Sequence, residues 1–200
     1  MRIVGGSHRG LQLAEVGPGD PAAHLRPTSD RVREAIFNLL LHGGHGDPVT
    51  GARVLDLFAG TGALGLEALS RGAARVAFVD DGAAARALLR RNIERMRAMG
   101  VTDVWRRNAA DLGPNRGAGY GLVFLDPPYG MRLGEAALAS AVAGGWLAAG
   151  AIIVWEEGAP PPVPPGFTLL DQRRYGGTVV TIIRAPGQSP VAQDGGSTAG

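Results

Sequence analysis

Short, nearly unbroken apolar runs alternate along this chain with segments of helical period. The clearest run is Arg53–Phe58, and further runs lie at residues 75–80, 101–106, 122–125 and 152–155. Strands buried on both faces of a parallel sheet have this composition. The intervening segments space their apolar residues as helices do, at residues 63–69, 83–99 and 134–142. Alternating strands and helices predict an α/β fold with a mostly parallel sheet.

The two ends of the chain differ from this alternation. Residues 167–170 and 178–184 flank Gly176-Gly177, which predicts an antiparallel pair that closes the sheet. Near the N-terminus, short alternating stretches on either side of Gly5-Gly6 predict a small hairpin. The last residues contain almost no large apolar side chain. We therefore expect a hairpin and loop over 1–25, a main domain over 26–186 and a disordered tail over 187–200.

Residues 28–40 predict a helix that begins at Thr28 or Ser29 and buries one apolar face. Three arginines near its start fall off that face, and two more lie in the hairpin: Arg26, Arg31, Arg33, Arg2 and Arg9. Such charges either form a solvated surface or bind the phosphates of a nucleic acid. The hairpin likewise either packs on the main domain as decoration or acts as a basic flap.

Composition narrows the class of protein without naming a function. The chain has 200 residues, 45% hydrophobic content and no apolar run long enough to span a membrane. Cysteine is absent, which excludes disulfides, thiolate metal ligands and a cysteine nucleophile and is typical of a cytoplasmic protein. The net charge is +2 and every basic residue is arginine. Overall charge therefore does not indicate a polyanionic partner.

A glycine turn, Ala59-Gly60-Thr61-Gly62, follows the run at Arg53–Phe58. Together with Gly65 it fits the dinucleotide pattern G-x-G-x-x-G, which is weak on its own. Asp56 lies just before the turn and would repel a pyrophosphate but attract an ammonium or sulfonium group. S-adenosylmethionine carries both cations and no phosphate. The alternative is that Asp56 only caps the turn that follows it.

Polar residues also follow the next two strands. Asp80 lies 20 residues after Gly60, where doubly wound folds place an acid that accepts hydrogen bonds from ribose hydroxyls. Asp81 is adjacent and is an alternative for this contact. After the third strand, Asn108 and the backbone amide of Ala109 are candidates to bind the adenine edge, and Asn108 is preferred over Asp111.

The fourth strand runs directly into Asp126-Pro127-Pro128-Tyr129. Two successive prolines fix the backbone and leave carbonyl oxygens free to accept hydrogen bonds. An acid at the carboxyl end of a parallel strand lies in the crevice where ligands bind. A carboxylate beside a carbonyl suits an NH₂ group, and Tyr129 offers a flat face on which a base can stack. A proline turn that merely ends a strand would explain neither Asp126 nor Tyr129.

These motifs carry a family resemblance. The run Asp-Leu-Phe-Ala-Gly-Thr-Gly followed by Asp-Pro-Pro-Tyr resembles the class I S-adenosylmethionine-dependent methyltransferases, which have a Rossmann-like sheet. Three further stretches narrow the resemblance to the RsmD type of 16S ribosomal RNA guanine-N2 methyltransferases: residues 2–10, 26–34 and 62–72. The resemblance covers about residues 1–184. One departure is Asp80-Asp81-Gly82, which leaves the ribose ligand open between the two acids.

The resemblance implies methyl transfer from S-adenosylmethionine to the N2 amine of a guanine in small-subunit ribosomal RNA. The implied catalytic residues are Asp126, Pro127, Pro128 and Tyr129. The implied cofactor-binding residues are Asp56, Phe58, Ala59, Gly60, Thr61, Gly62, Asp80, Asp81, Asn108 and Ala109. The implied RNA-binding residues are Arg2, Arg9, Arg26, Arg31 and Arg33. We expect no metal, because a sulfonium is already a good leaving group, and a monomeric cytoplasmic enzyme whose partner is ribosomal RNA or a 30S particle.

Other functions share parts of this pattern. A DNA amino-methyltransferase or a protein glutamine methyltransferase would keep the chemistry, but no separate DNA-recognition domain is evident and Asp126 replaces the expected asparagine of glutamine-modifying enzymes. A nicotinamide-dependent oxidoreductase shares the glycines and the distant acid, yet leaves Asp56 and the turn at 126–129 unexplained. An RNA-binding protein with an inactive cofactor pocket is the third alternative.

Overall fold

The computed structural model describes residues 1–14 and 29–187, so Arg26 and nearly all of the expected tail lie outside the described residues. The strands are β1 (Arg53–Leu57), β2 (Arg75–Val79), β3 (Thr102–Trp105), β4 (Tyr120–Leu125), β5 (Leu147–Glu157), β6 (Thr168–Tyr175) and β7 (Thr178–Arg184). The helices are α1 (Asp30–His42), α2 (Ala63–Ser70), α3 (Ala83–Arg95) and α4 (Leu133–Ala143), with short 3₁₀ turns at Gly6–His8 and Met99–Val101.

All seven strands form one sheet in the order β3-β2-β1-β4-β5-β7-β6. The first five strands are parallel, whereas β7 is antiparallel to both β5 and β6. The expected mostly parallel sheet with an antiparallel closing strand is confirmed. The strand order reverses between β1 and β4, which opens a crevice at the carboxyl ends of these two strands.

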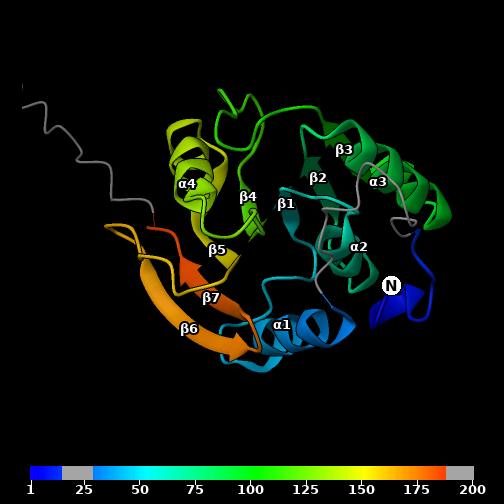
Figure 1. Ribbon diagram of the computed structural model, residues 1–200, viewed down its shortest axis with the longest axis horizontal. Helices are drawn as coiled ribbons and strands as arrows, with labels where there is room; N and C mark the ends of the chain where they lie inside the picture. The colour runs from blue at the N-terminus through cyan, green and yellow to red at the C-terminus, as the bar shows by residue number, and fades with distance from the viewer. Residues whose placement is uncertain (15–28, 188–200) are drawn as a thin grey trace, which may run out of the picture.

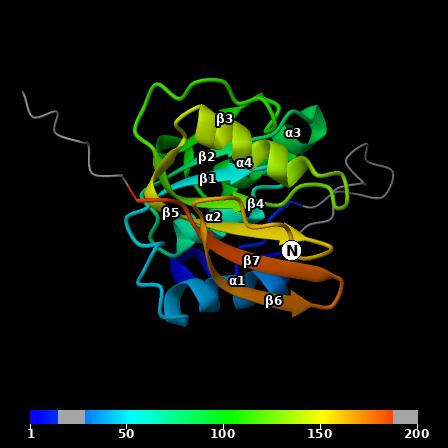
Figure 2. The ribbon, with the colours of Figure 1, turned by 90° about the vertical axis from the view of Figure 1, so that its left-hand side faces the viewer.

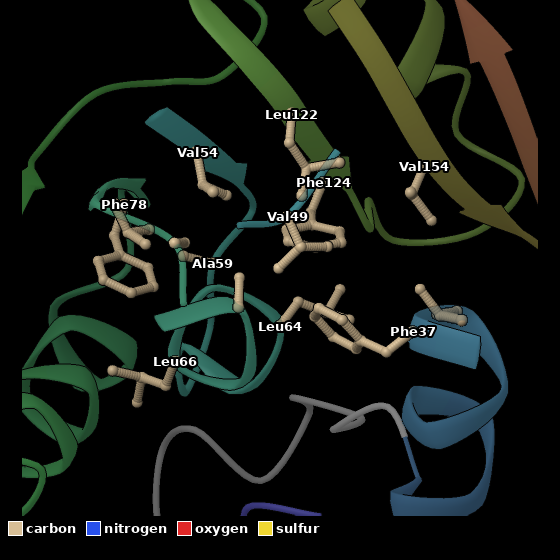
Figure 3. Packing of buried hydrophobic residues seen from close by; sticks show 14 of the residues in the cluster. Phe37, Val49, Val54, Ala59, Leu64, Leu66, Phe78, Leu122, Phe124 and Val154 are labelled. Carbon is tan, nitrogen blue, oxygen red and sulfur yellow. The ribbon is translucent and has the colours of Figure 1, made fainter. Parts of the chain in front are cut away.

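Helices cover both faces of this sheet, as Figure 1 shows with α4 on one side of the strands and α1 and α2 on the other. The larger buried cluster joins α1, α2 and α3 to the sheet, and Figure 3 shows Phe37 reaching from α1 toward Leu64 of α2. A second cluster packs α4 against the opposite face. Both faces are therefore buried, which explains the continuous apolar runs in the central strands.

The end of β6 differs from expectation. The β6 strand continues to Tyr175, five residues beyond the expected Leu170, because it pairs with β7 along its whole length. This strand lies at the edge of the sheet, where Gln172, Arg173 and Arg174 remain exposed. Its second half is therefore polar and lacks the apolar pattern by which a strand is recognised in a sequence.

Within the described residues, no helix has the length and apolar character needed to cross a membrane.

The N-terminal segment folds back on itself and docks onto α2. Arg2 forms an antiparallel bridge with Gln12, and Ile3 N–H donates to the Leu11 carbonyl at 3.0 Å. Ile3 and Leu13 are buried in the larger cluster, so residues 1–14 are part of the main core. Gly6 has φ +76°, and a Cβ there would lie 1.8 Å from the Ser70 carbonyl oxygen. Only glycine fits this approach to the end of α2.

Candidate functional site

The glycine turn and the turn at 126–129 leave the same edge of the sheet side by side. Leu57 and Leu125, the last residues of β1 and β4, lie in register. The Asp126 N–H then donates to the Leu57 carbonyl at 3.5 Å. The topology thus joins the two turns that the sequence separates by more than 60 residues, at the point where the strand order reverses.

The glycine turn is compact and leads straight into α2. Gly62 N–H donates to the Ala59 carbonyl at 2.7 Å, and Gly62 has φ +80°. A Cβ on Gly62 would lie 2.3 Å from Leu89 Cδ1 of α3, so the turn and α3 pack too closely for a side chain here. The turn therefore presents backbone and the N-terminus of α2 to the crevice, as nucleotide-binding corners do.

Phe58 occupies an unusual backbone conformation at the start of this turn. Its φ is +60°, in the left-handed region that a bulky side chain rarely adopts. Strained backbone of this kind concentrates at functional sites. Phe58 also lines a pocket together with residues that follow β2 and β3.

Five expected cofactor-binding residues share this pocket: Phe58, Asp80, Asp81, Asn108 and Ala109. Val79 and Arg107 complete its lining. The free volume is about 30 Å³, which is room for a water molecule but not for an adenosyl group.

The structure separates the alternatives for adenine and ribose only in part. Asn108 lines the pocket, whereas Asp111 lines a different hollow beside α4. Both Asp80 and Asp81 line the pocket. Asp80 accepts hydrogen bonds from Gly60 N–H and Gly82 N–H, each at 2.8 Å, so it also braces the glycine turn against the start of α3.

Three carboxylates gather around the glycine turn: Asp56, Asp80 and Asp126. Asp56 is buried, and its Oδ2 accepts a hydrogen bond from Gly65 N–H at 2.9 Å, which is the capping role considered as the alternative for this residue. Burial raises the pKa of the Asp56 carboxyl well above its ordinary value, and the negative charges of Asp126 and Asp80 raise it further. The charges of Asp80 and Asp126 make the region favourable for a cation and unfavourable for a pyrophosphate.

The residues of the turn at 126–129 differ in their exposure to solvent. Pro127 is buried, Asp126 is half-buried and Tyr129 is 38% exposed. Burial raises the pKa of Tyr129 to about 12, against the lowering effect of a hydrogen bond with Thr178. The phenol therefore stays protonated at neutral pH, and its hydroxyl is hydrogen-bonded to Thr178.

The expected RNA-binding arginines do not form one group. Arg2 and Arg31 are exposed near the start of α1, where Arg2 pairs with Asp30 at 3.5 Å. Arg9 is exposed in the turn of the N-terminal segment, which docks at the C-terminal end of α2, away from the glycine turn. Arg26 lies outside the described residues.

The expectation for Arg33 was wrong. Its side chain is fully buried, with ion pairs to Glu67 at 3.4 Å and Asp30 at 2.7 Å, and it also donates to the Arg2 carbonyl. Arg33 lies three, four and seven residues before the buried apolar residues of α1 and so shares their face, which means that the helical period itself points it inward. The docked N-terminal segment covers this side of α1. Arg33 therefore holds the fold together and is not available to bind RNA.

Sequence reasoning missed several residues of the site. Arg107 was detectable, because it directly precedes Asn108 after β3, and its guanidinium lies 4.5 Å from the centre of the Trp105 ring. Glu157 and Thr178 carried no local signal, since β5 and β7 bring them to the turn at 126–129 from far along the chain. Among residues 1–14 and 29–187, no three His, Asp or Glu side chains are grouped so as to hold a metal ion.

Comparisons with known proteins agree with this geometry. The family model described as conserved hypothetical protein 95 matches residues 1–184. Ribosomal RNA small subunit methyltransferase D of Escherichia coli is 36% identical over 191 residues, covering 94% of this chain and 91% of the relative. The protein of the same name from Haemophilus influenzae is 33% identical over 181 residues, covering 88% and 89%.

A solved structure extends the agreement to three dimensions. A putative methyltransferase from Escherichia coli superposes with a TM-score of 0.78 at 35% identity, covering 94% of this chain and 99% of that protein. The fold is therefore that of the class I methyltransferases. The family match over nearly the whole described chain and the shared architecture lead to one conclusion: this chain belongs to the conserved hypothetical protein 95 family of methyltransferases.

Proposed function

We propose that this protein transfers a methyl group from S-adenosylmethionine to the N2 amine of a guanine in 16S ribosomal RNA. The observation that carries the proposal is the meeting of two features at one edge of the sheet. An acidic glycine turn that favours a cation lies beside a rigid turn of carboxylate, carbonyl and aromatic groups. The names of the relatives from Escherichia coli and Haemophilus influenzae point to small-subunit ribosomal RNA as the substrate.

The residues around the pocket fit S-adenosylmethionine better than a dinucleotide. When bound, this cofactor supplies a methyl group on a positively charged sulfur. Asp80 or Asp81 would accept hydrogen bonds from its ribose hydroxyls, and Asn108 and the Ala109 amide would bind its adenine. Asp56, buried behind the turn, would act through the Gly65 amide that it holds. A pyrophosphate would face the negative charges of Asp80 and Asp126 at this position.

The substrate amine would be held by the turn at 126–129. The Asp126 carboxylate and the Pro127 carbonyl would accept its two hydrogens, which turns the nitrogen lone pair toward the methyl group. Tyr129 would stack on the guanine through its exposed ring face. Such positioning contributes about 7–11 kcal/mol to catalysis when the reactants are well oriented. A base buried in structured RNA must first be extruded, at a cost of a few kcal/mol.

Further aspects of the proposal concern the partner and the setting. We propose that a monomer acts in the cytoplasm on free ribosomal RNA or on an assembled 30S particle, without a metal. Of the arginines expected to bind RNA, Arg2 and Arg31 are exposed near the start of α1, where they would bind RNA phosphates. Arg26 remains a proposed contact outside the described residues.

The test is methyl transfer followed by mapping of the product. Purified protein is incubated with labelled S-adenosylmethionine and either naked 16S RNA or 30S particles from a strain that lacks the gene. Labelled N2-methylguanosine at one position, found by mass spectrometry of the digested RNA, is the expected result. Calorimetric titration with S-adenosylmethionine and with NAD separates this proposal from an oxidoreductase. Label in another base, in DNA or in a protein glutamine would overturn the proposed substrate.

A further inference from the structure

The turn at 126–129 and the residue after it are hydrogen-bonded to one residue of β5 and one of β7. Glu157 ends β5 and Thr178 begins β7, and because these strands are antiparallel, both residues lie at the same edge of the sheet as the turn. The Tyr129 hydroxyl is hydrogen-bonded to Thr178 Oγ1 at 3.1 Å. The Gly130 N–H, next along the turn, donates to Glu157 Oε1 at 3.0 Å. Two successive residues are thus held by β5 and β7, which are separate from the turn in the sequence.

The same contacts fix the orientation of the Tyr129 ring. Glu157 Oε1 also accepts from Gly158 N–H at 2.9 Å, which holds the chain after β5 against the turn. Gly158 lies near the ring, since a Cβ built on it would make an ordinary contact of 3.4 Å with Tyr129 Cδ2. The residue as a whole is nevertheless 38% exposed. The aromatic side chain is therefore anchored at its hydroxyl end and remains partly accessible.

We propose that Thr178 and Glu157 are positioning residues that hold the Tyr129 ring ready to receive the target base. The inference rests on the proposed function, because it assumes a base that stacks on this ring. An aromatic side chain fixed before binding loses less conformational freedom when the base arrives. The brace also keeps the ring in a constant relation to Asp126 and the Pro127 carbonyl, which are to hold the amine of the same base.

The hydroxyl contact is tested with Thr178→Val, which removes the hydroxyl and keeps the shape. We expect kcat/KM for the RNA substrate to fall about two- to tenfold, the range of one lost hydrogen bond. The dissociation constant of S-adenosylmethionine, measured by calorimetry, should stay within twofold of wild type. Thr178→Ser keeps the hydroxyl and should restore most of the loss. Thr168→Val, the same change at an exposed residue on the opposite edge of the sheet, is the matched control.

A double-mutant cycle distinguishes this brace from a general structural effect. Tyr129→Phe removes the other half of the hydrogen bond and keeps the ring. If the brace acts as inferred, the double variant Thr178→Val/Tyr129→Phe should be no slower than the worse of the two single variants. Losses that multiply in the double variant would overturn the inference, because each residue would then act through a different contact.

The carboxylate contact has its own pair of variants. Glu157→Gln keeps an oxygen that accepts from Gly130 N–H and should retain kcat/KM within about twofold. Glu157→Leu leaves that amide without its acceptor and should lose about two- to tenfold, again without change in cofactor affinity.

The outcomes separate the inference from the function on which it rests. Absence of label in guanine with the wild-type protein would overturn the proposed function. Label at wild-type rate with Thr178→Val and Glu157→Leu, while the wild-type protein methylates guanine, would overturn only the brace.

Discussion

Glu67 connects the N-terminal segment to the helices below the sheet, and its replacement should be severely destabilising. The side chain is fully buried on α2. One oxygen accepts from Val4 N–H at 2.9 Å and from Arg33 Nε at 3.4 Å. The other oxygen accepts from Gly5 N–H and Arg71 Nε, both at 2.8 Å. A single carboxylate thus balances a buried guanidinium and satisfies two backbone amides.

The size of the effect follows from these partners. Removing one member of a buried ion pair costs about 3–5 kcal/mol, and Arg33 stays fully buried without Glu67. Its remaining pair with Asp30 places the loss at the lower end of that range. Each amide left without its acceptor adds about 1 kcal/mol. We expect Glu67→Ala to lower the free energy of unfolding by about 5 kcal/mol, which is comparable to the whole stability of a marginal domain.

Urea denaturation followed by circular dichroism measures this change. Glu67→Gln keeps the shape and one acceptor oxygen but removes the charge, so it should cost about 3 kcal/mol and remain measurable if Glu67→Ala does not fold. Glu34→Ala, an exposed acid on α1, is the control and should change stability by less than about 0.5 kcal/mol. A loss below about 1 kcal/mol for Glu67→Ala would refute the network as a source of stability.

Three further predictions concern the site and its charges. Asp126→Asn should reduce methyl transfer at least about 100-fold, while the calorimetric affinity for S-adenosylmethionine stays within a few fold; wild-type turnover would remove the carboxylate from the mechanism. Because burial raises the folded-state pKa of Asp56 above 3.8, the folded protein keeps a proton that the unfolded chain releases. The free energy of unfolding should therefore fall by up to about 1.4 kcal/mol per pH unit as pH rises from 3.8 toward that pKa. Urea titrations at several pH values measure this dependence, and Asp56→Asn should lose the contribution of Asp56 to it. If the variant had the same dependence of stability on pH as the wild type, the raised pKa would be contradicted. Arg31→Ala should weaken RNA binding and reduce the slope of log affinity against log salt concentration by about one. Arg184→Ala, an exposed residue at the other edge of the sheet, should leave affinity and slope unchanged. Equal slopes for the two variants would show that Arg31 contacts solvent and not RNA.

Much of the fold was contained in local patterns. The apolar runs predicted the central strands because both faces of the sheet are covered, and the glycines predicted a tight turn because Gly62 adopts positive φ against α3. The turn at 126–129 could be predicted from its residue types alone. Polar edge strands give no such signal, which is why the second half of β6 was missed.

Side-chain environment depended on segments that meet only in the folded chain. The helical period places Arg33 on the buried face of α1, but its buried ion-pair partner, Glu67, comes from α2 and has no signal near Arg33 in the sequence. Likewise, the sequence left Asp56 open between a cofactor contact and a cap, and the position of Gly65 N–H shows the cap. Local periodicity carries no information about such long-range contacts.

The sequence by itself determined the alternation of strands and helices, the glycine turn and the acid-proline-aromatic turn, because each depends on neighbours within a few residues. Only the tertiary structure decided that these turns lie side by side, that Arg33 pairs with Glu67 and that Thr178 and Glu157 hold Tyr129 and its neighbour. These relations arise from strand order and from the packing of distant segments, and their geometry exists only once the sheet has formed.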